Sequence, residues 1–223
     1  MDIKEKLFAM KEEKYGDFSA SLMPDMPRER VIGVRIPKLR AFVKEISGNT
    51  SDFISILPHY FFEENNLHAF IISSISDFDR CVSEVDRFLP YIDNWATCDS
   101  LRPSCFSKNK DKLLEYIYRW IRSDKVYTVR FAIEMLMVHY LEDDYSDDYA
   151  KLVASVRSEE YYVNMMIGWY FATALTKRWD SVIYFIEEGL ISPVARKMAI
   201  RKGIESLAIP NERKAYLREL SRN

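Results

Sequence analysis

Trp95 and Asp99 stand four residues apart and combine an indole with a carboxylate. On a helix this spacing makes both side chains project from one face. A fixed carboxylate can stabilise a developing positive charge and position a water molecule. The negative face of an indole attracts a cation by roughly 0.5–2 kcal/mol. The pair is thus a candidate site for chemistry on a cationic centre, the alternative being a core tryptophan beside a solvated or capping aspartate.

Arg130 is a candidate phosphate ligand. It lies in a predicted helix from Ser123 to about Leu141, where it flanks an apolar stripe instead of the polar side. A guanidinium in that position can bind a phosphate through two parallel hydrogen bonds and can brace a carboxylate. An ion pair with Glu134, four residues later, is the structural alternative, although this orientation is the weaker one.

Trp169 lies in a segment, residues 163–172, that is apolar nearly all round. Such a pattern is typical of a helix buried among other helices. Trp169 can therefore be either a core residue or a second indole at a site. The two remaining tryptophans, Trp120 and Trp179, are predicted to be packing residues.

Charge is distributed unevenly along the chain, although the net charge is only −2. Residues 50–99 hold 2 basic and 9 acidic side chains, whereas residues 190–223 hold 8 basic and 3 acidic ones. Arg196, Lys197, Arg201 and Lys202 form a stripe along one predicted helix. Such a stripe can contact phosphates, which dominate affinity for nucleic acids. Two independently solvated helix faces are the alternative.

Several functional classes are disfavoured by what the sequence lacks. No G-x-x-x-x-G-K-[ST], G-x-S-x-G or G-x-G-x-x-G motif occurs, and the histidines form no H-E-x-x-H arrangement. The three cysteines form no C-x-x-C pair, so we expect reduced thiols and neither a zinc site nor a disulfide framework. We therefore predict no metal and no cofactor. Without a signal-peptide layout or an apolar run of about 18 residues, we expect a cytoplasmic protein.

The elements that must position these residues are predicted to be helices. Hydrophobic residues make up 48% of the chain and charged residues 30%, which is typical of a globular protein. We find no clean apolar and polar alternation long enough for a sheet, and the 223 residues fit one domain, 1–223. About a dozen short helices with short joints favour an all-α stack of antiparallel helix pairs. The helices are expected to begin near Asp2, Pro37, Ser51, Glu63, Asp77, Asp93, Lys110, Ser123, Tyr145, Ser158, Trp179, Ser192 and Pro210.

The stretch from Tyr15 to Arg30 departs from this order. It contains Gly16, Pro24 and Pro27, and two prolines three residues apart exclude a continuous helix across them. We interpret the stretch as an irregular connector, with at most a single helical turn over residues 18–22.

Six stretches that follow one another along the chain carry a resemblance to a known family. The first two are FSASLMP (18–24) and VIGVRIPKLR (31–40), and the central one is LPYIDNWATCD (89–99). The last three are YTVRFAIEMLM (127–137), SEEYYVNMMIGW (158–169) and AIRKGIES (199–206). Through these stretches, in this order, the sequence resembles the DNA alkylation repair family along essentially its whole length. A basic residue that the family usually carries after the last motif is replaced by Leu207.

The resemblance implies a right-handed solenoid of HEAT-like helix pairs whose concave face holds double-stranded DNA. It further implies a glycosylase that removes cationic N3- and N7-alkylated purines without a deep pocket for an everted base. The implied site residues are the catalytic aspartate Asp99, the two tryptophans Trp95 and Trp169 and the arginine Arg130, which should converge on the concave face. Arg35 and the C-terminal basic stripe are expected to contact the DNA backbone. We expect a monomer.

A second function stays open, that of a non-catalytic HEAT-like protein that binds DNA structures or a protein partner. In active members of the family the N-terminal helices complete the DNA cleft. If the connector from Tyr15 to Arg30 folds away from the site, one wall of the cleft is missing. The affinity for duplex DNA is then expected to be low and strongly salt-dependent.

Overall fold

The computed structural model describes residues 2–46 and 50–222, and these residues contain helices and no strand. The expected all-helical class is confirmed. The chain divides into two compact units, Met1–Asn109 and Lys110–Asn223. The prediction of a single domain, 1–223, stays a prediction. No helix in the described part of the chain is long and apolar enough to cross a membrane.

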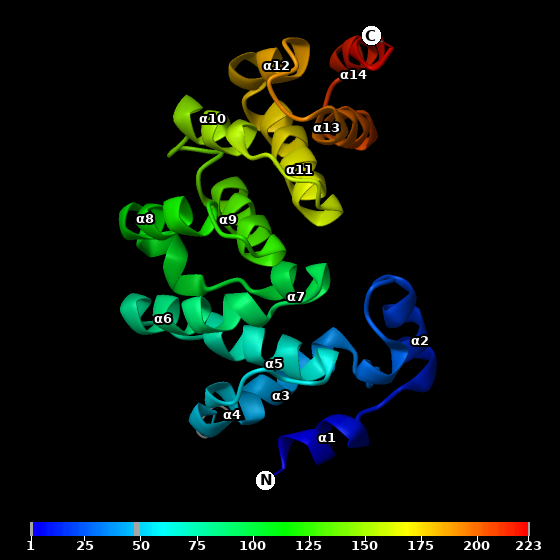
Figure 1. Ribbon diagram of the computed structural model, residues 1–223, viewed down its shortest axis with the longest axis vertical. Helices are drawn as coiled ribbons and strands as arrows, with labels where there is room; N and C mark the ends of the chain where they lie inside the picture. Colours follow the sequence, from blue (N-terminus) through cyan, green and yellow to red (C-terminus); the bar gives the residue numbers. More distant parts are fainter. Residues whose placement is uncertain (1, 47–49, 223) are drawn as a thin grey trace. The chain divides into compact units, whose positions relative to one another are not determined.

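The first unit is built around α5 (Phe62–Ser73), which packs against α3, α4, α6 and α7 (Figure 1). Buried residues occur all round α5, as expected for a helix enclosed by others. The remaining elements of this unit are α1 (Ile3–Ala9), α2 (Glu13–Ser21), η1 (Arg28–Arg30), α3 (Ile36–Glu45), α4 (Ser51–Ser55), α6 (Phe78–Phe88), η2 (Leu89–Tyr91), α7 (Trp95–Ser100) and η3 (Ser104–Lys108).

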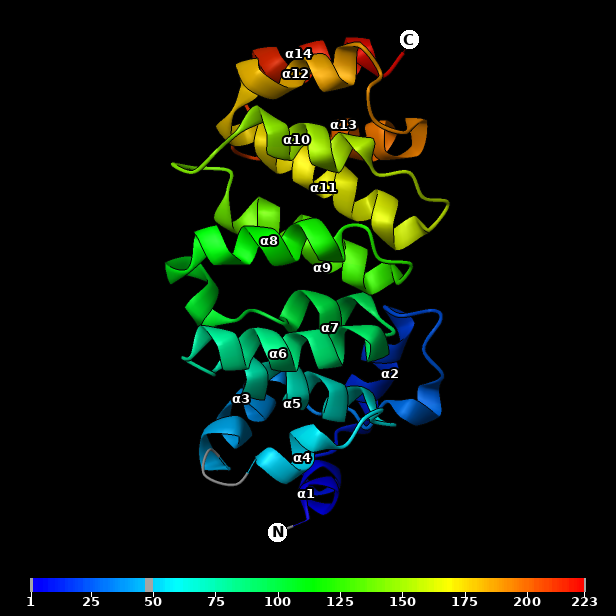
Figure 2. The same cartoon turned by 60° about the vertical axis from the view of Figure 1, so that its left-hand side comes forward.

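The second unit is built around α11 (Tyr161–Lys177), which packs against α9, α10, α12 and α13 (Figure 2). Its core includes the fully buried Tyr170, Phe171 and Phe185. The other helices here are α8 (Lys110–Trp120), α9 (Val126–His139), α10 (Asp147–Ser155), α12 (Trp179–Glu187), α13 (Pro193–Glu205) and α14 (Asn211–Leu220).

Each helix that the sequence predicted begins within about three residues of its expected position, and several of these starts carry a side-chain cap. Asp77, Ser146 and Ser192 each accept a hydrogen bond from a backbone N–H in the first turn of α6, α10 and α13. Pro193 then occupies the first turn of α13, where its missing N–H costs nothing.

The expected irregular connector is wrong in its first half. Residues 15–21 belong to α2, which continues through Gly16 and ends before Pro24. Gly16 is tolerated because the helix needs a close contact there: a Cβ on Gly16 would lie 3.3 Å from the Cα of Gly33. Gly33 in turn has φ +96°, a conformation that favours glycine. The close packing of the two glycines outweighs the low helix propensity of Gly16.

A fully buried carboxylate holds the segment that follows the connector. Glu63 of α5 accepts hydrogen bonds from the backbone N–H groups of Ile32, Gly33 and Val34, at 2.8, 2.7 and 3.2 Å. Hydrogen bonds of this charge-assisted kind are roughly twice as strong as neutral ones. The connector is therefore fastened to the centre of the first unit although most of it lacks regular structure after Ser21.

Candidate functional site

Helix α7 is anchored to α5 by a chain of buried hydrogen bonds. Asn94 caps the helix, with its Oδ1 accepting from the Thr97 N–H at 2.8 Å. The Thr97 hydroxyl donates to the Asn66 Oδ1 at 2.9 Å. Since Asn94, Thr97 and Asn66 are all buried, this network fixes the rotation of α7 and hence the direction of Trp95 and Asp99.

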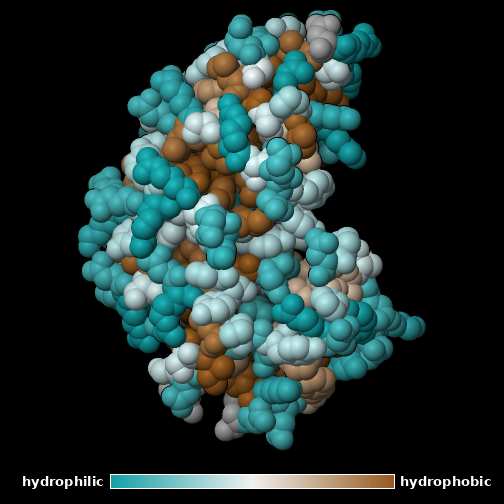
Figure 3. All heavy atoms as spheres, viewed as in Figure 1, coloured by the Kyte–Doolittle hydropathy of each residue, from teal (hydrophilic) through white to brown (hydrophobic). Residues whose placement is uncertain are grey.

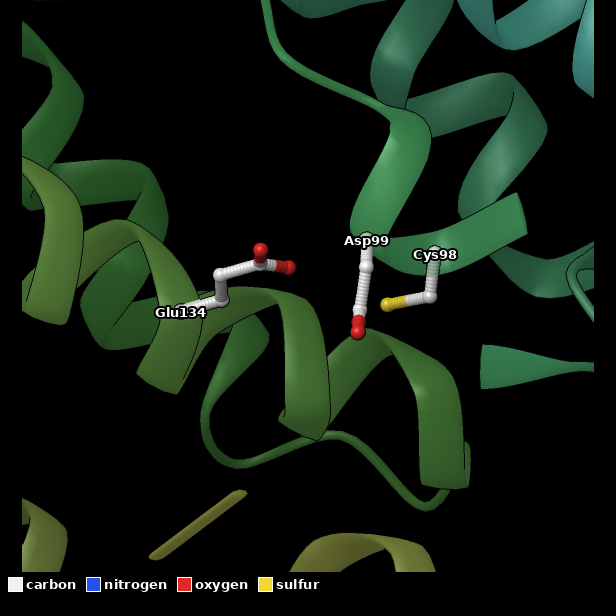
Figure 4. A group of neighbouring side chains, drawn as sticks. All are labelled: Cys98, Asp99 and Glu134. Carbon is white, nitrogen blue, oxygen red and sulfur yellow. The ribbon is translucent and has the colours of Figure 1, made fainter. Parts of the chain in front are cut away.

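Asp99 lies in the last turn of α7 and is half-buried. Figure 4 shows its carboxylate projecting from the helix beside the neighbouring Cys98, whose thiol is buried. The Nε of Arg102 donates to the backbone carbonyl of Asp99 at 3.2 Å and so closes the end of the helix. Figure 4 also labels Glu134, which is a buried residue of α9 in the second unit. Asp99 is thus a carboxylate on a short, well-anchored helix.

The Trp95 indole contacts the N-terminal connector. Its Nε1 donates to the backbone carbonyl of Leu22 at 3.1 Å, 73 residues away in sequence. The indole is half-buried and packs against an apolar cluster. The buried members of this cluster are Met23, Met26, Val31 and Phe62. The connector therefore folds onto the first turn of α7, instead of away from it.

Arg130 is buried in the second unit, with an exposed fraction of 3%. Its Nη1 donates to the backbone carbonyl of Tyr162 at 3.0 Å, which joins α9 to α11. A buried guanidinium retains its charge, so this contact fixes the position of a cation.

Trp169 is only half-buried, although the helix that carries it is the centre of the second unit. The Nζ of Lys202 lies 5.8 Å from the centroid of the indole, within the range of a cation–π interaction. The structure thus places one of the two candidate tryptophans beside a residue of the basic stripe.

The remaining basic candidates differ in what they contact. The Arg196 guanidinium donates to the carbonyls of Ile186 and Leu220, at 2.8 and 2.9 Å, and so ties α13 to α12 and α14. Lys197 and Arg201 are exposed on α13, and the Nε of Arg201 lies 2.9 Å from the Oε1 of Glu205. Lys197, Arg201 and Lys202 stay candidate phosphate ligands of the stripe.

Arg35 is exposed in the first unit and has two partners that the sequence did not suggest. Its Nε lies 2.8 Å from Glu12, and its guanidinium lies 4.9 Å from the centroid of the Tyr15 ring. Hydrogen bonds from Lys38 and Arg35 hold the pKa of Glu12 below its ordinary value. The Arg35 guanidinium is therefore already paired with the carboxylate of Glu12, which lies just before α2.

Two sets of candidates emerge, one in each unit. Trp95 and Asp99 share α7 in the first unit, whereas Arg130, Trp169 and the basic stripe occupy α9, α11 and α13 of the second. Sequence reasoning missed the role of Glu63, because nothing in the sequence distinguishes this fully buried carboxylate from its half-buried neighbour Glu64. It also missed the exposed Tyr161 on α11.

The described residues thus form an all-helical protein of short packed helices, with the candidate carboxylate and one indole in the first unit and the second indole and the basic stripe in the second. A family model described as DNA alkylation repair enzyme matches residues 3–207. The chain belongs to this family, and its role is in DNA repair. No curated protein matches the chain.

Proposed function

We propose that the protein is a monofunctional DNA glycosylase that removes cationic N3- and N7-alkylated purines from duplex DNA. The family match supports a repair enzyme, and it spans all four candidate residues. The observation that carries the finer proposal is the anchored α7, which presents Asp99 and Trp95 four residues apart on one short helix.

These residues need to stabilise the transition state only modestly, because the substrate is already activated. Alkylation at N3 or N7 places a positive charge on the purine, which already weakens the bond between base and sugar. Asp99 stabilises the oxocarbenium-like sugar as that bond breaks and positions the attacking water. Trp95 and Trp169 contact the cationic base or sugar through their π-faces. Arg130, buried and held by the Tyr162 carbonyl, contributes a fixed positive charge that can brace a carboxylate.

The proposal requires the four side chains to act on one nucleotide. Residues that act as a unit have strongly non-additive effects on rate, so kinetics can test this requirement. A combined Asp99→Asn and Arg130→Met variant should lose little more activity than the more damaging single variant. Fully additive losses would indicate two independent sites.

A non-catalytic DNA-binding function is the second candidate, and one contact favours it. The Trp95 Nε1 is occupied by the Leu22 carbonyl, and the indole packs against the connector's apolar cluster. An indole committed to packing has less surface to offer a cationic base. On this alternative the protein binds DNA structures without breaking a glycosidic bond.

The deciding experiment compares excision with binding on matched DNA. A duplex that carries one 7-methylguanine is incubated with the protein, and abasic sites are measured by strand cleavage in hot alkali. Binding of the undamaged duplex is measured in parallel. Base release supports the glycosylase, binding without release supports the non-catalytic alternative, and the absence of both contradicts a function on duplex DNA.

A further inference from the structure

A groove runs between α11 and α13 in the second unit, where the two helices lie side by side (Figure 1). Its volume is about 610 Å³, within the roughly 300–1,000 Å³ of typical small-ligand pockets. Apolar side chains from both helices line it together with basic ones from α13. These residues are Tyr161, Met165, Val194, Lys197, Met198, Arg201, Lys202 and Glu205.

The groove exists because α11 and α13 approach closely at one point. A Cβ on Gly168 would lie 2.6 Å from the Cβ of Met198 and 3.2 Å from the backbone N of Ala199. Only glycine permits this approach. Beside this contact the longer side chains of Tyr161 and Met165 on α11 and of Val194 and Met198 on α13 line the groove.

The α11 wall is apolar and is formed by Tyr161 and Met165. These two residues are four positions apart and so share a face of the helix. Tyr161 has an exposed fraction of 56%, and Met165 is half-buried. Across the groove, Val194 is 52% exposed. An exposed tyrosine at the edge of such a groove offers a flat ring to a planar ligand.

The α13 wall is basic. Lys197 and Arg201 are both exposed and are separated by one helical turn, a rise of about 6 Å. Glu205 is the acid that lines the groove, and it pairs with Arg201. An exposed ion pair of this kind is weak, so a phosphate can replace Glu205 as the partner of Arg201 at little cost. Figure 3, seen in the same view as Figure 1, shows hydrophilic and hydrophobic residues side by side over the C-terminal helices α12 to α14.

We propose that this groove binds a DNA strand at an unpaired nucleotide, whose base stacks on Tyr161 while its flanking phosphates contact Lys197 and Arg201. The inference rests on the DNA-binding part of the proposed function. An aromatic platform beside a positive groove is the arrangement by which proteins bind unstacked bases without sequence preference. Bases within an intact duplex have no accessible face, so the exposed ring selects an unpaired base over a paired one.

The test uses two fluorescently labelled duplexes that are identical except for one unpaired adenine in the second. Binding of each is measured by anisotropy for the wild-type protein and for Tyr161→Ala, Tyr161→Phe and Tyr60→Ala. Tyr60 is a matched control because it has the same exposed fraction, 56%, and lies in the other unit. Circular dichroism melting of each variant shows whether it is folded.

We expect the wild type to bind the duplex with the unpaired adenine more tightly than the paired one. Tyr161→Ala should reduce this preference by about tenfold, the loss of one stacked base, and leave binding of the paired duplex unchanged. Tyr161→Phe and Tyr60→Ala should keep the preference.

Two results would overturn the inference alone: a wild type that binds both duplexes equally, or a Tyr161→Ala protein that keeps the preference or loses affinity equally for both. If the wild type binds neither duplex, the proposed DNA-binding function fails together with the inference.

Discussion

At the scale of single residues, the candidate chemistry depends on Asp99. A carboxylate that stabilises an oxocarbenium-like sugar contributes through its charge, which an amide of the same shape lacks. Asp99→Asn should therefore lower the rate of 7-methylguanine excision by at least about 10²-fold, a typical loss for one electrostatic stabiliser. Affinity for DNA should stay nearly unchanged or rise slightly, because a negative charge near phosphates is removed.

The control for this substitution is Asp52→Asn, which changes an exposed aspartate on α4 of the same unit. It should leave excision unaltered. An Asp99→Asn protein that excises at the wild-type rate would exclude the proposed role of the carboxylate.

The carboxylate of Glu63 holds the backbone of residues 32–34 through three hydrogen bonds. Glu63→Gln replaces an acceptor of three N–H donors by an amide that can present only one oxygen to them. We expect the free energy of unfolding to fall by about 2–4 kcal/mol, the cost of leaving buried polar groups unpaired. Urea denaturation measures the loss, and hydrogen exchange at residues 32–34 should accelerate.

The neighbouring Glu64 provides the matched control. Its carboxylate accepts only one hydrogen bond, from the Phe61 N–H at 2.9 Å at the start of the helix. Glu64→Gln should therefore cost no more than about 1 kcal/mol, as the loss of a capping interaction does. Equal losses for the two variants would contradict the special role of Glu63.

At the scale of elements, α5 and α6 enclose a histidine pair that makes stability depend on pH. The Nε2 of His59 lies 2.9 Å from the Nδ1 of His68, whose ring stacks on Phe88 of α6 at 4.2 Å. Burial lowers the pKa of His59 to about 4. Burial, with the charges of His59 and Arg87, lowers the pKa of His68 to about 3. Both rings are therefore neutral in the folded protein at pH 7.

This pair predicts that the protein loses stability in mild acid. The unfolded chain takes up protons below its histidine pKa of about 6.5, whereas the folded protein does not until about pH 3–4. Stability is thus complete above pH 6.5 and falls between pH 6.5 and 4, by about 2–4 kcal/mol from pH 7 to pH 5. Denaturation at several pH values measures the slope.

His68→Gln removes one titrating group and should flatten this pH dependence. His139→Gln, which changes a histidine of α9 in the other unit, should preserve it. If the slopes of the two variants are the same, the buried pair does not control acid stability.

At the scale of the whole molecule, the proposed binding of DNA depends on the uneven distribution of charge along the chain. The net charge of −2 disfavours nonspecific attraction, so phosphate contacts must come from local basic groups such as those on α13. Lys197→Ala should weaken binding of every duplex by a similar factor. It should also reduce the slope of log affinity against log salt by about 1, since one fewer counterion is released.

Lys44→Ala serves as the control because Lys44 is an exposed lysine on α3 of the first unit. It should leave the salt slope unchanged. A Lys197→Ala protein with the wild-type slope would show that the basic stripe does not contact phosphate.

Local rules account for most of what the sequence determined by itself. Caps such as Asp77 and Ser192 act within four residues, and hydrophobic periodicity identifies which segments are helices and which faces are apolar. The resemblance carried by several motifs in order identified the family, which the match over residues 3–207 confirms. The candidate site residues came from the same motifs, and their roles stay predictions.

Only the tertiary structure decided which partner each residue has. Gly16 is helical because Gly33 packs against it, and the Trp95 indole is tied to Leu22, 73 residues away. Arg196 resembles its basic neighbours in sequence, yet its guanidinium joins three helices. Hydrophobic periodicity shows whether a helix face is apolar or charged, but it does not show which residues pack against that face. Contacts between residues distant in sequence therefore appear only when the chain is folded.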